Sequence, residues 1–312
     1  MPVLDDLLSR RVLFVTGKGG TGKSSVAAAL AVSANSTGRR VLLVDVDAKS
    51  DAARFLDDEP SVYRAKQALP GLWHLAMNPQ LALDEYLRLS LKLPRMYRLG
   101  PLHKVFDFIA TAAPGAREVL ITGKIGFEER AVEDGRPRWD LIVVDAAASG
   151  QVLSHLRGPR TLQELVGAGI IRNQTDWVRE LIEDPIRTGM VVVALAEEMP
   201  VAETRELVEE APRQVATPVL AVVANRVVPP PSHPAALAAL RASAPAVERA
   251  GGGTLDAALD AAALYESLSE SQQPHLSALR ALGLPVIEVP LLPVARHTIS
   301  TTRLVAGALE AA

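Results

Sequence analysis

A chain of 312 residues, 48% of them hydrophobic, can bury a large core, and its formal net charge of −3 lacks the basic bias of proteins that grip a nucleic-acid backbone. The absence of cysteine excludes disulfides, iron–sulfur clusters and zinc sites built from CxxC motifs. No apolar run approaches the roughly 18 residues of a membrane span, and the N-terminal segment carries Asp5 and Asp6 instead of the basic start of a signal peptide. We therefore expect a cytoplasmic protein that neither binds nucleic acid nor spans a membrane.

The first expected strand, residues 12–15, leads into a glycine-rich loop. The loop consists of Gly17, Lys18, Gly19, Gly20, Thr21, Gly22, Lys23, Ser24 and Ser25. Residues 25–34 are rich in helix formers, and Gly38 is a suitable residue to end that helix. A strand, this loop pattern and a helix together indicate a phosphate-binding loop, in which Lys23 contacts the β- and γ-phosphates of a nucleotide and Ser24 ligates Mg²⁺. A glycine-rich turn without a ligand is the weaker alternative.

A second strand is expected over residues 41–46, and two carboxylates, Asp45 and Asp47, lie at its end. Ligands bind at the carboxyl ends of strands in open α/β sheets, so both side chains are candidate site residues. The alternative is that the two aspartates only cap a helix that begins near Ser50.

Residues 80–138 form an insert between the second and third expected strands, far longer than the roughly 12 residues that a crossover helix needs. Aromatic residues gather in it, among leucines and basic side chains: Tyr86, Tyr97, Phe106 and Phe108. We favour a helical subdomain that buries these side chains against its own chain or a partner. A surface that binds a hydrophobic client is the alternative.

The third expected strand, residues 141–144, is apolar and ends in Asp145. This arrangement is typical of a Walker B motif, whose carboxylate acts through water on the Mg²⁺ shell. Gly150 follows near the expected position of the γ-phosphate and is predicted to present its backbone N–H group there.

Further apolar strands are expected over residues 190–195, 219–223 and 286–289. Apolar strands that alternate with helices predict an α/β fold, a P-loop NTPase with a mostly parallel central sheet flanked by helices, plus the helical insert. We expect residues 1–312 to form a single ATPase domain. A second helical excursion, residues 229–280, begins with three prolines and contains a helix from residue 255 to residue 280.

The loop has one lysine more than the phosphate-binding pattern needs. Lys18 resembles the signature lysine of the deviant Walker A ATPases, a group that includes MinD, ParA and the arsenical pump ATPase. The resemblance implies a dimer in which Lys18 reaches the partner's nucleotide and offsets charge on the transferred phosphoryl group. It also implies that Asp47 orients the attacking water and that Asp45 holds Mg²⁺-bound water.

Three segments narrow the resemblance to the ArsA (arsenical pump) family and its eukaryotic relative, which guides tail-anchored proteins to membranes. They are residues 114–118, 145–151 and 197–207. The family pattern implies that Asn225 contacts adenine and that Pro290, Leu291 and Leu292 stack on it, although Asn225 could simply end a strand.

Departures from the family pattern concern the switch loops and the client. The loop after the second strand is one residue shorter, and Gln151 replaces a histidine. Without cysteine, neither a thiol site for a metalloid nor a zinc-clasped dimer can form. Because the switch loops depart from the family pattern, coupling between hydrolysis and client release is expected to differ from that of the family.

We therefore expect a Mg²⁺-dependent, ATP-hydrolysing dimer in which the nucleotide state switches the insert and controls binding of a membrane protein or another hydrophobic client. The dimer is either a homodimer or a heterodimer with a related ATPase. One alternative is a MinD-like membrane-positioning ATPase, which residues 301–312 disfavour because they form no basic amphipathic helix. The other is a nucleotide-gated scaffold with little turnover.

Overall fold

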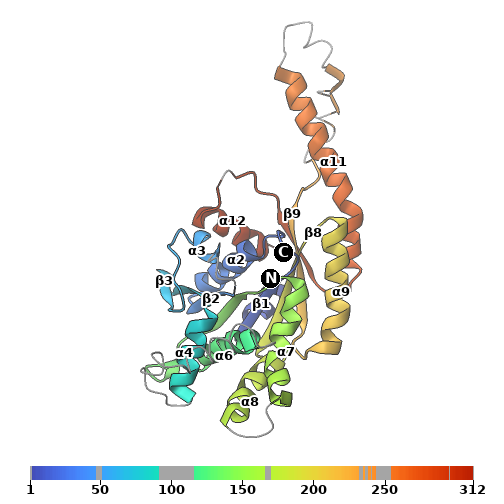
Figure 1. Ribbon diagram of the computed structural model, residues 1–312. Helices are drawn as coiled ribbons and strands as arrows, with labels where there is room; N and C mark the ends of the chain where they lie inside the picture. Colours follow the sequence, from blue (N-terminus) through green and yellow to red (C-terminus); the bar gives the residue numbers. More distant parts are fainter. Residues whose placement is uncertain are drawn as a thin grey trace.

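An eight-stranded sheet forms the centre of the computed structural model (Figure 1), in the order β10-β9-β8-β1-β7-β2-β4-β3. The structure describes residues 2–46, 51–90, 116–165, 170–231, 235, 238–239, 241–243, 254–294 and 296–311. The strands are β1 (Val12–Thr16), β2 (Val41–Asp45), β3 (Lys66–Leu69), β4 (Leu72–Ala76), β7 (Leu141–Asp145), β8 (Thr188–Leu195), β9 (Val219–Val227) and β10 (Val286–Pro290). Neighbouring strands are parallel except β3, which pairs antiparallel with β4. The predicted α/β class with a mostly parallel sheet is confirmed.

The central strands are buried on both faces. Every residue of β1, β2 and β7 is buried, because helices cover the two sides of the sheet. Successive residues of β1 therefore enter different cores: Leu13 and Val15 face one side, and Val12 and Phe14 face the other. Such strands appear as continuous apolar runs in a sequence, which made β1, β2 and β7 predictable. All six predicted strands are found.

One face of the sheet is covered by α1 (Pro2–Leu8), α2 (Lys23–Ser36) and α12 (Ile299–Glu310). Helix α2 is buried from Ser25 to Ala34, since it lies between the sheet and α12 (Figure 1). A hydrogen bond of 2.7 Å from Ser33 Oγ to Glu310 Oε1 joins the two helices. The helix that follows the phosphate-binding loop is thus held at the centre of the fold, and its N-terminus is fixed by its surroundings.

The other face packs against α6 (Ala116–Arg130), α7 (Ser149–Leu165), α8 (Ile170–Glu183) and α9 (Glu198–Gln214). Helix α11 (Thr254–Arg280) buries Leu276 and Leu279 beside β9, while Leu264 in its N-terminal half is exposed. Figure 1 shows this half extending away from the sheet. The helix predicted over residues 255–280 is confirmed.

Strands β3 and β4 were not predicted. Strand β4 contains His74, a polar side chain that is buried in this strand, where its Nε2 lies 2.8 Å from Asp58 Oδ2. A short hairpin of β5 (Val132–Glu133) and β6 (Arg136–Pro137) was also not predicted. Its turn residues, Asp134 and Gly135, both have positive φ, as this type of tight hairpin requires.

The insert, residues 80–138, is described only in part. It contains most of α4 (Pro79–Ser90), all of α6 and the β5–β6 hairpin. Residues 91–115, including Tyr97, Phe106 and Phe108, lie outside the described residues, so the prediction of a client surface stays a prediction. Within the part of the chain that the structure describes, no helix is both long and apolar enough to cross a membrane.

Candidate nucleotide-binding site

The glycine-rich loop joins β1 to α2, and two of its glycines are in close contact with the rest of the fold. Gly17 has a φ of 146°, and a Cβ atom there would lie 2.0 Å from the carbonyl oxygen of Val193 in β8. Gly22 has a φ of 93°, and a Cβ atom there would lie 2.2 Å from Nδ2 of Asn225 in β9. Only glycine fits both the backbone angle and the space at these positions. The loop is therefore fixed against the ends of two neighbouring strands.

The loop also folds around the carbonyl oxygen of Lys18. Thr21 Oγ1 donates a hydrogen bond of 2.9 Å to this oxygen, and Lys23 Nζ donates one of 3.3 Å. The N-cap of α2 is Gly22, which provides no side-chain cap. The first-turn N–H groups of Lys23, Ser24 and Ser25 have no intrahelical acceptor, and the positive end of the helix dipole lies with them. This end of α2 is suited to bind phosphate.

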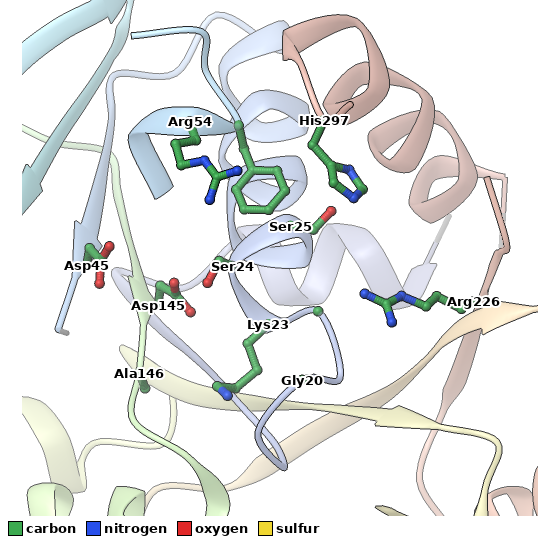
Figure 2. Close-up of a pocket in the computed structure, with 12 residues that line it drawn as sticks. Gly20, Lys23, Ser24, Ser25, Asp45, Arg54, Asp145, Ala146, Arg226 and His297 are labelled. Atoms are coloured by element: carbon green, nitrogen blue, oxygen red, sulfur yellow. The ribbon is translucent and has the colours of Figure 1, made fainter. Parts of the chain in front are cut away.

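Two buried carboxylates lie next to the loop. Asp45 and Asp145 are direct register partners at the ends of β2 and β7, with exposures of 3% and 6%. Figure 2 shows both side chains on the side of the cavity where Ser24 lies. The backbone N–H of Ala52 donates to Asp45 Oδ2 at 3.4 Å, so the predicted helix-capping role of Asp45 is also present, at α3 (Asp51–Arg54).

This donor set fits Mg²⁺, a hard cation that prefers oxygen ligands and is usually held by few protein groups together with water and phosphate oxygens. Ser24 offers a hydroxyl for direct ligation. Asp45 and Asp145 can hold water molecules of the ion's shell. The residues predicted for the metal thus lie together in the fold.

A cavity of about 420 Å³ opens beside the loop, a volume typical of small-molecule sites. It is lined by Gly20, Gly22, Lys23, Ser24, Ser25, Asp45, Arg54, Phe55, Asp145, Ala146, Arg226 and His297. Sequence reasoning missed Arg54, Phe55, Arg226 and His297. The rings of Phe55 and His297, far apart in the chain, have centroids 5.4 Å apart, and both residues line the cavity. Of these four residues, only Arg226 could have been suspected from the sequence, because it directly follows Asn225, a predicted site residue.

Both polar atoms of the Asn225 side-chain amide form hydrogen bonds. Nδ2 donates to the carbonyl oxygen of Thr21 at 2.8 Å, and Oδ1 accepts from the N–H of Arg226 at 3.0 Å. Its side chain is buried and clamps the loop to β9. The predicted stacking residues begin at Pro290, the last residue of β10, after which Leu291 is exposed and Leu292 packs against the core. Adenine contact by these residues stays a prediction.

Lys18 points to a different neighbour than Lys23 does. Its Nζ lies 2.5 Å from Oε1 of Glu203 in α9, and Oε2 of Glu203 accepts a 3.2 Å hydrogen bond from Ser149 Oγ. Gly150, in the first turn of α7, is exposed. Asp47 lies outside the described residues. The roles predicted for Gly150 and Asp47 stay predictions.

Comparison with known proteins finds relatives that are ATPases. Residues 10–175, which include the loop and both carboxylates, match the sequence model of the anion-transporting ATPases (ArsA ATPase). The chain is 35% identical to the ATPase BagA of Mycobacterium tuberculosis over 73% of this chain and 68% of that protein. It is 28% identical to an arsenical pump-driving ATPase of Escherichia coli, over 58% of this chain and 33% of that one. It is 27% identical to the ATPase get3 of Schizosaccharomyces japonicus, over 52% and 48%.

Proposed function

Because this chain belongs to the ArsA family of anion-transporting ATPases, we propose that it hydrolyses ATP as a magnesium-dependent dimer whose nucleotide state controls a client-binding segment. That the chain is an ATPase follows from its family and from relatives that are themselves named ATPases. The metal, the dimer and the client are the proposed part.

The observation that carries the proposal is the cavity beside the phosphate-binding loop. It brings Lys23, Ser24 and Asp145 to one place, from the loop and from the end of β7. Lys23 and the first-turn N–H groups of α2 would bind the β- and γ-phosphates, while Ser24 would ligate the metal directly and Asp145 would act on it through water. Mg²⁺, when bound, offsets the charge that develops on the phosphate oxygens.

Hydrolysis needs an oriented water molecule, and we assign that role to Asp47. It follows two residues after Asp45 in the sequence, and Asp45 ends β2 and lines the cavity. Gly150, at the start of α7, is assigned to contact the γ-phosphate through its N–H group. Asn225 and residues 290–292 are assigned to the adenine, together with Arg226, which lines the cavity.

The dimer is supported by where Lys18 lies. Of the two loop lysines, both of which the structure describes, Lys23 lines the cavity and Lys18 does not. Lys18 instead extends to Glu203, so its charge is not used on the nucleotide of its own chain. A loop lysine in this position is suited to act on the nucleotide of a second subunit, which would be another copy of this chain or a related ATPase. We place this dimer in the cytoplasm.

The client segment is the insert, residues 80–138. Two helices of the insert, α4 and α6, are joined by Lys124 of α6. Its Nζ lies 3.0 Å from Oε2 of Glu85 in α4 and 2.9 Å from Oε1 of Glu128 in α6. Lys124 is almost fully buried, so this link is held firmly. A joined pair of helices can transmit a movement to the apolar residues between them, where a hydrophobic client or membrane protein would bind.

The dimer and the metal can be tested together by measuring ATPase activity per chain across a dilution series. We expect activity per chain to rise with protein concentration and to reach a plateau, because each complete site needs two subunits. Removal of divalent cations with EDTA should abolish turnover, and added Mg²⁺ should restore it. Activity per chain that stays constant below the dimer dissociation constant, measured by sedimentation, would contradict the dimeric site.

A further inference from the structure

Glu203 joins three elements around the phosphate-binding loop. Its Oε1 pairs with Lys18 of the loop at 2.5 Å, and its Oε2 accepts from Ser149, the first residue of α7, at 3.2 Å. The N–H of Ser149 in turn donates to the carbonyl oxygen of Gly17 at 3.1 Å. One carboxylate of α9 is therefore bonded to the loop and to the helix that begins shortly after Asp145.

The ion pair between Lys18 and Glu203 is accessible to solvent. The side chains are 30% and 33% exposed. On α9, Glu203 lies next to the buried face formed by Val201, Thr204 and Leu207. Ion pairs in such surroundings are weak, because water and salt screen them. Lys18 can therefore exchange Glu203 for another acceptor at little cost. The pair contributes little to holding α9 on the sheet, because the apolar face of α9 provides that contact.

The charge of Lys18 has two competing acceptors. In the free chain it is bound by a carboxylate outside the cavity. In a dimer, the phosphate groups of the partner's nucleotide carry more negative charge than one carboxylate. The ammonium group cannot contact both acceptors fully, so contact with phosphate requires that Lys18 leave Glu203.

We propose that Glu203 is a positioning residue that holds Lys18 outside its own cavity in the free chain and releases it to the partner's nucleotide on dimerisation. This inference rests on the proposed dimeric ATPase. Breaking the ion pair opposes association, so Glu203 sets the protein concentration at which the active dimer forms. When Lys18 leaves, the Glu203 carboxylate keeps only its hydrogen bond from Ser149. Dimerisation therefore changes a contact at the first residue of α7.

The test compares Glu203→Gln with Glu206→Gln, which removes the same charge from an exposed position of the same helix. ATPase activity per chain is measured across a dilution series in Mg²⁺ and ATP. For Glu203→Gln we expect the half-maximal protein concentration to fall roughly two- to thirtyfold, the combined effect of two screened ion pairs, because a symmetric dimer breaks one pair in each subunit. The plateau activity should match the wild type, since Lys18 has left Glu203 in the dimer. Glu206→Gln should show the wild-type curve.

A half-maximal concentration that is unchanged or higher in Glu203→Gln would overturn the inference, as would an equal shift in Glu206→Gln. Glu203→Ala, which removes the carboxylate group altogether, should shift the curve in the same direction. Thermal unfolding of each variant without nucleotide should match the wild type, because the apolar face of α9 is intact. Failure of the proposed function is distinguishable: wild-type activity would then not depend on concentration, and Lys18→Ala would be as active as the wild type.

Discussion

Replacement of Asp47 by asparagine should leave ATP affinity within about twofold of the wild type and lower turnover by at least about a hundredfold. Asparagine has nearly the same shape but no negative charge, so it can occupy the same place without polarising a water molecule. Asp47 follows the second strand and is not part of the phosphate-binding loop, residues 17–25, to which we assign the contacts that hold the nucleotide. ATP binding is measured by titration and turnover by steady-state phosphate release.

The assignment of Asp47 would be wrong if Asp47→Asn failed to bind ATP while remaining folded. It would also be wrong if the variant kept wild-type turnover. The scaffold alternative makes a separate prediction, since a protein with little turnover would show no difference between this variant and the wild type.

Replacement of Lys23 by alanine should remove both binding and turnover. Its ammonium group lies at the start of α2, where it is bonded to the carbonyl oxygen of Lys18, and it is the loop cation that lines the cavity. Losing a preorganised cation at the phosphates should lower kcat/KM by at least about 10²- to 10³-fold. The same titration and phosphate-release measurements on Lys23→Ala and Asp47→Asn separate binding from chemistry.

Wild-type affinity for ATP in Lys23→Ala would contradict the phosphate role of this residue. The fold itself should survive the change, because the α2 residues that form the core begin at Ser25. A matching thermal unfolding temperature without nucleotide is therefore the control for Lys23→Ala.

Sequence patterns predicted the parts of the fold that depend on local composition. The strands that contain Leu13, Leu43 and Val143 appear as apolar runs because both of their faces are covered. The phosphate-binding loop was predictable for a similar reason, since its glycines occupy backbone conformations and close contacts that other residues cannot. Strand β4 escaped prediction because His74 is polar, and its burial depends on Asp58, a partner that the pattern does not reveal.

The rest of the site depends on topology, which brings separate segments together. Phe55 and His297 are far apart in the chain and meet only because α12 packs against α2 beside α3. The pairing of Lys18 with Glu203 joins positions 185 residues apart, and nothing in the sequence near either residue indicates it. Asn225 was predicted from the family resemblance as an adenine contact, and the structure adds a clamp on the loop that local sequence could not indicate.

The central claim, that Lys18 of one subunit completes the site of another, is tested most directly by mixing two inactive variants. Lys18→Ala and Asp47→Asn chains are combined in equal amounts, and ATPase activity is compared with that of each variant alone. A mixed dimer contains one complete site, with Asp47 from one chain and Lys18 from the other. Random pairing should therefore restore about a quarter of the wild-type sites. Activity that never exceeds the sum of the separate variants, although sedimentation shows that the chains associate, would contradict the claim.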